Sequence, residues 1–242
     1  MKKMFKVLIF TDLDGTLLHR ETFEFNEIKE YLNQLLSKGI IIVTNTSKTE
    51  KEILEFNNEL GSSLPYISEN GASIKGLDLL NSNLPKELIL SREKDNLINI
   101  FEKSVPVNLQ NKCKWLSKMD KKKQSIIFGL KDEKLNMALD RKYTIPFIFE
   151  GNKGEKKELY KIVKKKGLAL QEGGRVINLT DRVNKAKALQ VFVRFFKKKN
   201  QDVKTIAVGD NYNDLDMLKT SDFPCLVFND KFTLDHIPIN DL

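Results

Sequence analysis

The segment KVLIFTDLDGTLL, residues 6–18, decides the fold class. We interpret Phe5–Phe10 as a buried strand, because the continuous apolar run Val7–Phe10 is typical of a parallel strand covered on both faces. Two carboxylates, Asp12 and Asp14, follow at once, and Gly15 permits a tight turn. In open parallel sheets, ligands bind beyond the carboxyl ends of the strands. The segment therefore predicts a strand that delivers two carboxylates to a ligand site.

The sequence on either side of this strand alternates between helix and strand patterns. We expect helices over Glu27–Lys38 and Thr49–Leu60 and strands over Ile40–Val43 and Tyr66–Ile67. After Asp181 the pattern returns, with helices over Ala186–Lys198 and Asp214–Lys219 and strands over Thr205–Val208 and Cys225–Phe228. Such alternation predicts an α/β fold, with a Rossmann-like parallel sheet and crossover helices.

The middle of the chain is less regular and predicts an inserted α+β domain with an antiparallel sheet. We expect helices over Ser91–Ser104, Asp132–Lys142 and Gly154–Lys166, and strands over Gln124–Leu130, Phe147–Glu150, Leu168–Gln171 and Arg175–Leu179. The run Glu172-Gly173-Gly174 between the last two strands is a hairpin signal. The expected division is a core over 1–80 and 184–242, with the insertion over 81–183.

The net charge is +8, and lysines cluster at Lys121–Lys123, Lys164–Lys166 and Lys197–Lys199. Such clusters are typical of solvated helix ends and loops, although a positive field also attracts anionic substrates. The clusters are scattered and no aromatic-interleaved basic strand or recognition-helix motif accompanies them, so we expect no nucleic-acid partner. No feature indicates an obligate protein partner.

The cysteine count and the apolar runs bear on the compartment. Cys113 and Cys225 are far apart and show no CxxC spacing, so neither a disulfide framework nor a zinc site is expected. The apolar run near the N-terminus is too short for a signal peptide and is interrupted by Asp12. No apolar run approaches the roughly 20 residues that a membrane helix needs. We expect a cytoplasmic protein that binds no membrane.

A second acidic group follows another predicted buried strand. It lies in Gly209-Asp210-Asn211-Tyr212-Asn213-Asp214, directly after Thr205–Val208. Magnesium prefers oxygen ligands and usually takes one or two carboxylates beside several waters. Asp12, Asp14 and Asp210 could share such a site. The alternative is a helix N-cap at Asp214 within an ordinary loop, and two acidic groups at the ends of two strands make that alternative weaker.

Two further residues suit a phosphate group. Thr46 lies just past the strand Ile40–Val43, where a hydroxyl and backbone N–H groups at a helix N-terminus can hold a phosphoryl oxygen. On its own, this residue would be better explained as an N-cap of the following helix. Lys185 precedes the helix Ala186–Lys198, and a cation there could neutralise both phosphate and nucleophile.

Taken in this order, the four segments resemble the haloacid dehalogenase superfamily of phosphatases. They are DLDGT at Asp12–Thr16, the hydroxyl of Thr46, Lys185, and GDxxND at Gly209–Asp214. The irregular middle region resembles the cap domain that many members insert. The resemblance implies an aspartyl-phosphate mechanism and Mg²⁺ as the cofactor.

A narrower resemblance is to the mannosyl-3-phosphoglycerate phosphatase family. It rests on FTDLDGTLL (Phe10–Leu18), TSKT (Thr46–Thr49), SENGA (Ser68–Ala72), PFIFE (Pro146–Glu150), EGGR (Glu172–Arg175) and NKAKA (Asn184–Ala188). The chain departs from the family at Asn184-Lys185-Ala186, where an Asp-Lys-Gly run is common. Some relatives act on the glucosyl compound, so the sugar stays open.

The resemblance implies a role for each site residue. Asp12 would be the nucleophile, and Asp14 would protonate the leaving alkoxide and then activate water. Thr46 and Lys185 would bind the transferring phosphoryl group. The metal ligands would be Asp12, Asp14 through its backbone carbonyl, Asp210, and Asp214 either directly or through water.

The rest of the substrate would be bound by Lys48, Arg175 and Asn213. A guanidinium such as that of Arg175 can hold a carboxylate bidentately, and a 3-phosphoglycerate moiety carries one. Gly173-Gly174 would let the backbone approach closely. The alternative for Arg175 is an ordinary arginine of a surface hairpin.

The expected function is hydrolysis of a small-molecule phosphate ester, mannosyl- or glucosyl-3-phosphoglycerate, to the glycosylglycerate. One alternative is a broader sugar phosphatase of the Cof-like or sucrose-phosphatase type. Another is a protein that binds phosphate esters without turnover, which no sequence feature favours because Asp12 and Asp14 are both present.

Overall fold

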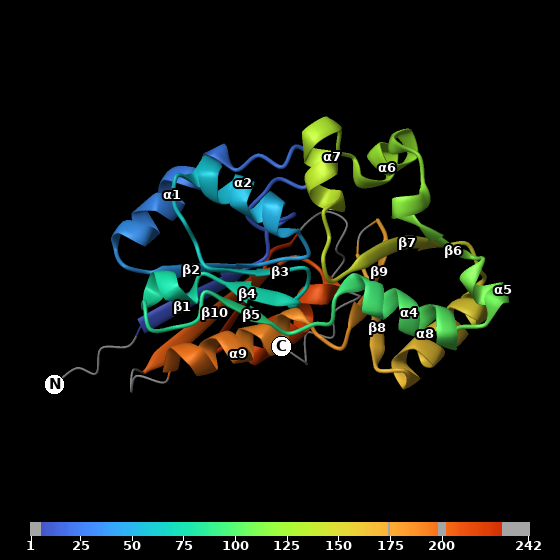
Figure 1. Cartoon of the computed structure of the whole chain (residues 1–242). Coiled ribbons are helices and arrows are strands. Elements are labelled where there is room, and N and C mark those ends of the chain that lie inside the picture. Colours follow the sequence, from blue (N-terminus) through green and yellow to red (C-terminus); the bar gives the residue numbers. More distant parts are fainter. Residues whose placement is uncertain (1–5, 174, 198–201, 229–242) are drawn as a thin grey trace. The chain divides into compact units, whose positions relative to one another are not determined.

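The computed structural model in Figure 1 describes residues 6–173, 175–197 and 202–228. Contacts divide the chain into two compact units. The core unit holds the residues up to Lys48, Ile53–Leu88 and the residues from Asn184 on, and the second unit holds Thr49–Glu52 and Ile89–Val183. The sequence estimate placed the first boundary near residue 81. In the structure, a strand over Glu87–Ile89 still joins the core sheet.

The core unit contains a seven-stranded sheet in the order β11-β10-β1-β2-β3-β4-β5. The strands are β1 (Lys6–Thr11), β2 (Ile41–Asn45), β3 (Tyr66–Ser68), β4 (Ser73–Lys75), β5 (Glu87–Ile89), β10 (Val203–Gly209) and β11 (Phe223–Leu226). Strand β1 pairs in parallel with both β10 and β2, and the pairs β10–β11 and β2–β3 are also parallel. Strand β4 runs antiparallel to β3. The expected Rossmann-like parallel sheet is confirmed.

Helices cover both faces of the core sheet (Figure 1), which is why β1 is continuously apolar over Val7–Phe10. The core helices are α1 (Asn26–Ser37), α2 (Glu50–Leu60), α3 (Leu77–Leu80), α9 (Lys185–Lys197) and α10 (Leu215–Thr220), with a 3₁₀ turn, η2, over Tyr212–Asp214. On one face, Leu32 of α1 and Ile53 of α2 pack into a cluster with Leu13. On the other, Phe192 of α9 meets Phe10 edge to face at 5.3 Å.

The second unit contains a four-stranded antiparallel sheet in the order β6-β7-β9-β8. Its strands are β6 (Cys113–Trp115), β7 (Ile145–Phe149), β8 (Leu168–Glu172) and β9 (Ile177–Asp181). Its helices are α4 (Lys94–Ser104), α5 (Val107–Gln110), α6 (Lys121–Phe128), α7 (Asp132–Leu139) and α8 (Lys153–Lys165), with a 3₁₀ turn, η1, over Leu116–Lys118. The predicted α+β domain with an antiparallel sheet is confirmed.

One face of this sheet carries the apolar core of the unit. Phe101 of α4 and Leu159 of α8 pack on Phe147 and Leu179, and all four side chains are at most 1% exposed. These residues alternate along β7 and β9 with side chains of the opposite face, as the two-residue repeat of a strand requires.

The predicted strand over Gln124–Leu130 is wrong, because this segment lies mostly in helix α6. Three consecutive apolar residues, Ile126–Phe128, suggest a strand by pattern. Local capping decides otherwise: the side chain of Asp120 accepts a hydrogen bond from the backbone N–H of Lys123, and Gly129 ends the helix with φ +68°. Ile126 is 72% exposed, so its apolar side chain is not evidence of a buried strand.

The hairpin signal after β8 corresponds to a real antiparallel connection. Strands β8 and β9 pair, with Glu172 opposite Ile177, and the N–H of Gly173 donates to the carbonyl of Val176 at 2.9 Å. Gly174 lies outside the described residues, as do Lys198 and Lys199 of one lysine cluster. Strand β9 begins at Ile177, so Arg175 belongs to the connection.

The partly exposed ion pair between Arg92 and Asp181 stabilises the second unit in a pH-dependent way. Arg92 donates through Nε (2.7 Å) and Nη2 (2.8 Å) to the carboxylate, which also accepts the backbone N–H groups of Arg92 and Arg182. The hydrogen bonds from Arg92 lead the causes that lower the pKa of Asp181 to about 2. A lowered pKa contributes stability above the unfolded value of 3.8, which is lost as the pH falls towards 2.

Asp181→Asn is therefore expected to cost about 1 kcal/mol of unfolding free energy at pH 7, a value reduced because Arg92 is partly exposed. This cost should shrink as the pH falls from about 4 to about 2, with the limits of that range good to about one pH unit. Urea unfolding at several pH values measures it. Glu158→Gln, at an exposed site on α8, is the control. An Asp181→Asn cost that does not change with pH would contradict the assignment.

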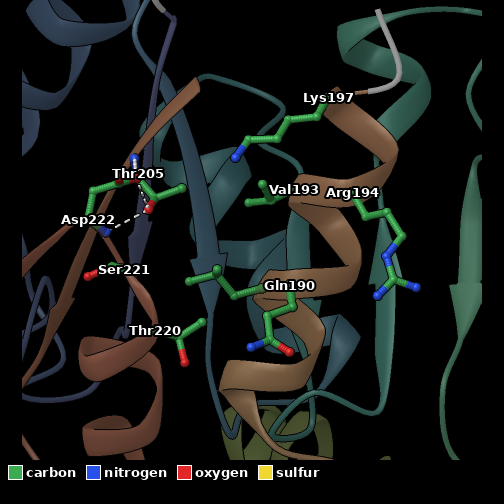
Figure 2. Close-up of a pocket in the computed structure, with 9 residues that line it drawn as sticks. Gln190, Val193, Arg194, Lys197, Thr205, Thr220, Ser221 and Asp222 are labelled. Atoms are coloured by element: carbon green, nitrogen blue, oxygen red, sulfur yellow. Dashed lines mark hydrogen bonds between the residues drawn. The ribbon is translucent and has the colours of Figure 1, made fainter. Parts of the chain in front are cut away.

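The described part of the chain holds no helix with the length and apolar character needed to cross a bilayer. The core unit has an open groove of about 630 Å³ between α9, the start of β10 and the end of α10. Figure 2 shows it, with Lys197 extending from α9 and Thr205 hydrogen-bonded to Asp222. None of the predicted site residues lines this groove, and Asp210 lies at the opposite end of β10.

Candidate active site

The carboxyl ends of three neighbouring strands bring the predicted site residues of the core together. Asp12 follows β1, Asp210 follows β10 and Thr46 follows β2. Since β1 lies between β10 and β2 and is parallel to both, the three strands end at the same edge of the sheet. Each of these three residues is at most 5% exposed.

A buried lysine links two of the aspartates. Nζ of Lys185 lies 2.8 Å from Oδ1 of Asp12 and 2.6 Å from Oδ1 of Asp214, and Lys185 is only 1% exposed. Burial disfavours the ammonium group, but the two carboxylates more than compensate, so the pKa of Lys185 is raised. Lys185 is thus a fixed cation beside Asp12. It is the first residue of α9, which begins one residue before the predicted start at Ala186.

Three buried carboxylates form a candidate cation site. Oxygens of Asp12, Asp210 and Asp214 all lie within 4.8 Å of one another. The pKa of Asp210 is raised to about 6, first by burial and then by the charges of Asp12 and Asp214. Burial also raises the pKa of Asp214, against the opposing effect of Lys185. This mutual repulsion among buried oxygen ligands fits a hard divalent cation such as Mg²⁺.

Asp214 is the most constrained member of this cluster. Its Oδ1 contacts Lys185, and its Oδ2 accepts the backbone N–H groups of Asp210 (3.2 Å) and Asn211 (3.1 Å). The carboxylate therefore orients Lys185 and closes the turn that carries Asp210. This arrangement suits a contact to a metal through water as well as a direct one.

Gly15 lets the two acidic segments approach each other. Its φ is +82°, and a Cβ atom at this position would lie 2.3 Å from Oδ2 of Asp210. Any side chain here would push Asp210 away from Asp12. The glycine of the DLDGT segment is therefore required for the geometry of the cluster, in addition to the turn.

The side chain of Asp14 is more exposed than those of the buried cluster. Its side chain is 37% exposed, and Nζ of Lys48 lies 3.0 Å from its Oδ1. Lys48 in turn lies over the ring of Phe23, at 5.0 Å from the centroid. Asp14 thus keeps a partly exposed carboxylate, while its cationic neighbour Lys48 is held in place.

The Thr46 segment is tied to its surroundings by backbone and side-chain hydrogen bonds. Thr46 is fully buried, its N–H donates to the carbonyl of Ile67 at 3.1 Å, and its Oγ1 accepts the N–H of Lys48 at 3.3 Å. The preceding Asn45 donates through Nδ2 to the carbonyl of Lys185 at 3.0 Å. The end of β2 and the start of α9 are thereby joined.

Sequence reasoning missed three residues of this site: Arg20, Asn45 and Asn70. Nη1 of Arg20 lies 3.7 Å from Oδ2 of Asp210. Asn70 accepts a hydrogen bond at Oδ1 from Nδ2 of Asn213, at 3.4 Å. No sequence spacing distinguishes site residues of this kind from other polar residues. The SENGA stretch was the available signal, since it places Asn70 directly after a strand that neighbours β2.

Asn213 and Arg175, the other predicted substrate-binding residues, lie in different units. Asn213 is half-buried in η2, beside the acidic cluster. Arg175 is exposed in the second unit, and its guanidinium lies against Gly129: a Cβ at that glycine would be 2.5 Å from Nη1. No salt bridge of Arg175 with a carboxylate occurs among residues 6–173, 175–197 and 202–228.

Comparison with known proteins gives relatives along nearly the whole chain. A protein of Persephonella marina named glucosyl-3-phosphoglycerate/mannosyl-3-phosphoglycerate phosphatase is 32% identical, over 96% of this chain and 89% of the relative. A mannosyl-3-phosphoglycerate phosphatase of Pyrococcus horikoshii is 27% identical, over 89% of this chain and 88% of its own length. The names of these relatives therefore describe phosphatases.

The fold also matches solved structures. A haloacid dehalogenase-like hydrolase from Bacteroides thetaiotaomicron superposes with a TM-score of 0.65 over 92% of this chain and 88% of that one, at 19% identity. This likeness shows the fold. The model of the haloacid dehalogenase-like hydrolase family matches residues 9–234, which include every residue of the acidic cluster and Lys185. The chain belongs to the haloacid dehalogenase-like hydrolase family.

Proposed function

We propose that this protein is a magnesium-dependent phosphatase that hydrolyses mannosyl- or glucosyl-3-phosphoglycerate to the glycosylglycerate. The observation that carries the proposal is the buried contact of Asp12 with Lys185, beside Asp210 and Asp214 at the carboxyl ends of β1 and β10. This arrangement offers a carboxylate nucleophile, a fixed cation and oxygen ligands for a metal at one place. The two free cysteines, Cys113 and Cys225, agree with the reducing cytoplasm that we propose as its compartment.

The first chemical step is attack by a carboxylate oxygen of Asp12 on phosphorus. The new bond makes an aspartyl-phosphate, the P–O ester bond breaks, and its electron pair leaves with the alkoxide oxygen. Asp14, whose carboxyl group is partly exposed, gives that oxygen its proton. Lys185 lies 2.8 Å from Asp12, so its positive charge stands beside the attacking oxygen and can offset the negative charge of the phosphoryl group.

The second step returns the enzyme to its starting state. Asp14, now ionised, takes a proton from water, and the water oxygen attacks phosphorus. The bond between phosphorus and Asp12 breaks, which releases inorganic phosphate and restores the carboxylate. Lys185 and Thr46 hold the phosphoryl oxygens in both steps. Mg²⁺, held by Asp12, Asp210, the Asp14 carbonyl and Asp214, would supply further charge neutralisation when bound.

The names of the relatives and the chemistry of Arg175 support the choice of substrate. The relatives at 32% and 27% identity are named for glycosyl-3-phosphoglycerates. Such substrates carry a carboxylate, and a guanidinium such as that of the exposed Arg175 is a fitting partner for it. We propose that Arg175 binds the glycerate carboxylate, with Lys48 and Asn213 contacting the substrate closer to the phosphate.

A comparison of kcat/KM values tests the proposed substrate. With Mg²⁺ present, mannosyl- or glucosyl-3-phosphoglycerate should exceed mannose 6-phosphate and glucose 6-phosphate by at least about tenfold, since charge-assisted carboxylate recognition is worth more than 1.4 kcal/mol. Removal of the metal with EDTA should abolish turnover. Hexose phosphates that perform better would favour a broader sugar phosphatase, and no turnover of any ester would favour a binding protein.

Arg175→Ala provides the matched variant for this panel. Its KM for the glycosyl-phosphoglycerate should rise by roughly 10- to 100-fold, because a charge-assisted pair with the carboxylate is lost. Turnover of p-nitrophenyl phosphate, which has no carboxylate, should stay the same. Arg194→Ala, an exposed arginine on α9, is the control. Equal losses on both substrates would show that Arg175 does not act on the carboxylate of the substrate.

A further inference from the structure

The connection between β3 and β4 is a strained and buried turn. Its residues Glu69, Asn70 and Gly71 have φ values of +47°, +59° and +95°. Side-chain-bearing residues rarely adopt this left-handed conformation, and two in succession are rarer. Hairpin turns usually lie at the surface, but Glu69 is 2% and Asn70 4% exposed. Strain of this kind persists where the surroundings impose it, and it accompanies functional sites.

The turn contacts the segment that carries Thr46. The N–H of Asn70 donates to the carbonyl of Thr46, and the N–H of Glu69 donates to the carbonyl of Lys48, both at 2.9 Å. Both left-handed residues thus direct their N–H groups to the same stretch of chain. The base of the turn is closed by Ser68 and Ser73, whose hydroxyl oxygens lie 2.9 Å apart.

The same turn contacts the segments that carry Lys185 and Asp214. A Cβ on Gly71 would lie 2.3 Å from the backbone oxygen of Asn184, so the turn packs directly on the residue before Lys185. Oδ1 of Asn70 accepts the Nδ2 hydrogen of Asn213 at 3.4 Å, next to Asp214 in η2. One short turn thus contacts all three segments that surround Asp12.

We propose that the Glu69–Gly71 turn positions the catalytic segments and that Asn70 is a positioning residue, which acts on Asn213 and through it on Asp214. The chain of contacts runs from Asn70 to Asn213, then along the backbone to Asp214, and from its Oδ1 to Nζ of Lys185. Loss of the Asn70 side chain loosens the placement of Lys185 against Asp12. The inference rests on the proposed function, since it assigns a task within the same site.

Asn70→Gly tests this role without adding strain, because glycine adopts a positive φ freely. The melting temperature should stay the same or rise, whereas kcat for p-nitrophenyl phosphate should fall by about 10- to 100-fold with KM changed less than about threefold, as is usual for residues that orient catalytic groups. Asn70→Asp keeps the Oδ1 acceptor and tolerates a left-handed backbone, so it should recover most of kcat.

Asp132→Gly is the matched control. Asp132 also has a positive φ, +47°, but it is exposed at the start of α7. Relief of strain there should leave kcat unchanged. If the wild-type protein hydrolyses phosphate esters and Asn70→Gly does so with the same kcat, the positioning role is overturned while the proposed function stands. If the wild-type protein hydrolyses none, the proposed function itself fails. A loss of kcat in Asn70→Gly that Asn70→Asp does not recover would also overturn the role of the acceptor.

Discussion

Asp12→Asn is expected to abolish turnover, with kcat reduced by a factor on the order of 10⁴ or more, because an amide cannot replace a carboxylate as the nucleophile. The residual rate should not depend on the phosphate ester used. Measurement needs a sensitive phosphate-release assay under saturating substrate. The wild-type protein should also become labelled at Asp12 during turnover, and the variant should not.

The same substitution should leave the fold intact. Lys185 keeps its contact with Asp214 at 2.6 Å, so the buried cation stays paired. One source of repulsion towards Asp210 and Asp214 disappears, since the charge of Asp12 raises the pKa of both. We therefore expect a change in unfolding free energy of no more than about 1–2 kcal/mol.

The control for Asp12→Asn is Asp95→Asn, at an exposed position in the first turn of α4. It makes the same chemical change away from the core sheet, and its kcat should equal that of the wild-type protein. Near-normal activity of Asp12→Asn in a folded protein would rule out the proposed nucleophile. An unfolded Asp12→Asn protein would instead show that the carboxylate is needed for stability.

The position of the cluster could be predicted because it depends on topology more than on side-chain detail. Asp12 and Asp210 each follow a strand that the sequence predicts as buried, and parallel strands that are neighbours in a sheet end together. Thr46 obeys the same rule at the end of β2. Any sequence with these strands in this order places the three residues at one edge.

Contacts that depend on backbone conformation could not be predicted in this way. Asparagine tolerates a positive φ better than most residues, but two left-handed residues with side chains in succession, Glu69 and Asn70, have no local sequence signal. Their conformation follows from hydrogen bonds to the Thr46 segment, which exist only once β2 and β3 have paired. Tertiary contacts thus determine the conformation of this turn, so it could not be inferred from the local sequence.

Helix α6 shows the opposite difficulty, in which local capping overrides an apolar pattern. Ile126–Phe128 reads as a strand because three apolar residues follow one another. Asp120 and Gly129 are the capping signals that define the helix. They are single residues at the two ends, and an apolar run between them obscures the helical period.

Lys185→Met is expected to produce the largest loss of stability. Methionine fills a similar volume but leaves Asp12 and Asp214 without their shared cation in a site where both are at most 5% exposed. Breaking a buried ion pair from one side costs roughly 3–5 kcal/mol of unfolding free energy. Turnover should fall by about 10²- to 10³-fold as well, because the cation beside the phosphoryl group is lost.

The pH dependence of this loss follows from the aspartates. Burial already raises the pKa of Asp214 above its ordinary value of 3.8, and removal of Lys185 takes away the main opposing effect. A carboxyl group with a raised pKa binds more protons in the folded than in the unfolded state, so stability increases as the pH falls towards the unfolded pKa. Lys185→Met should therefore be less destabilised near pH 5 than at pH 7, by urea unfolding.

The double variant Lys185→Met/Asp214→Asn separates the loss of the cation from the charge that it leaves behind. Asparagine keeps an oxygen for the N–H groups of Asp210 and Asn211, so the turn after β10 can persist. The double variant should be more stable than Lys185→Met alone, because one unpaired charge has gone. Lys197→Met, an exposed lysine at the end of the same helix, should cost little. If the double variant were less stable than the single one, the penalty would arise from packing around Lys185, since an unpaired Asp214 charge could no longer account for it.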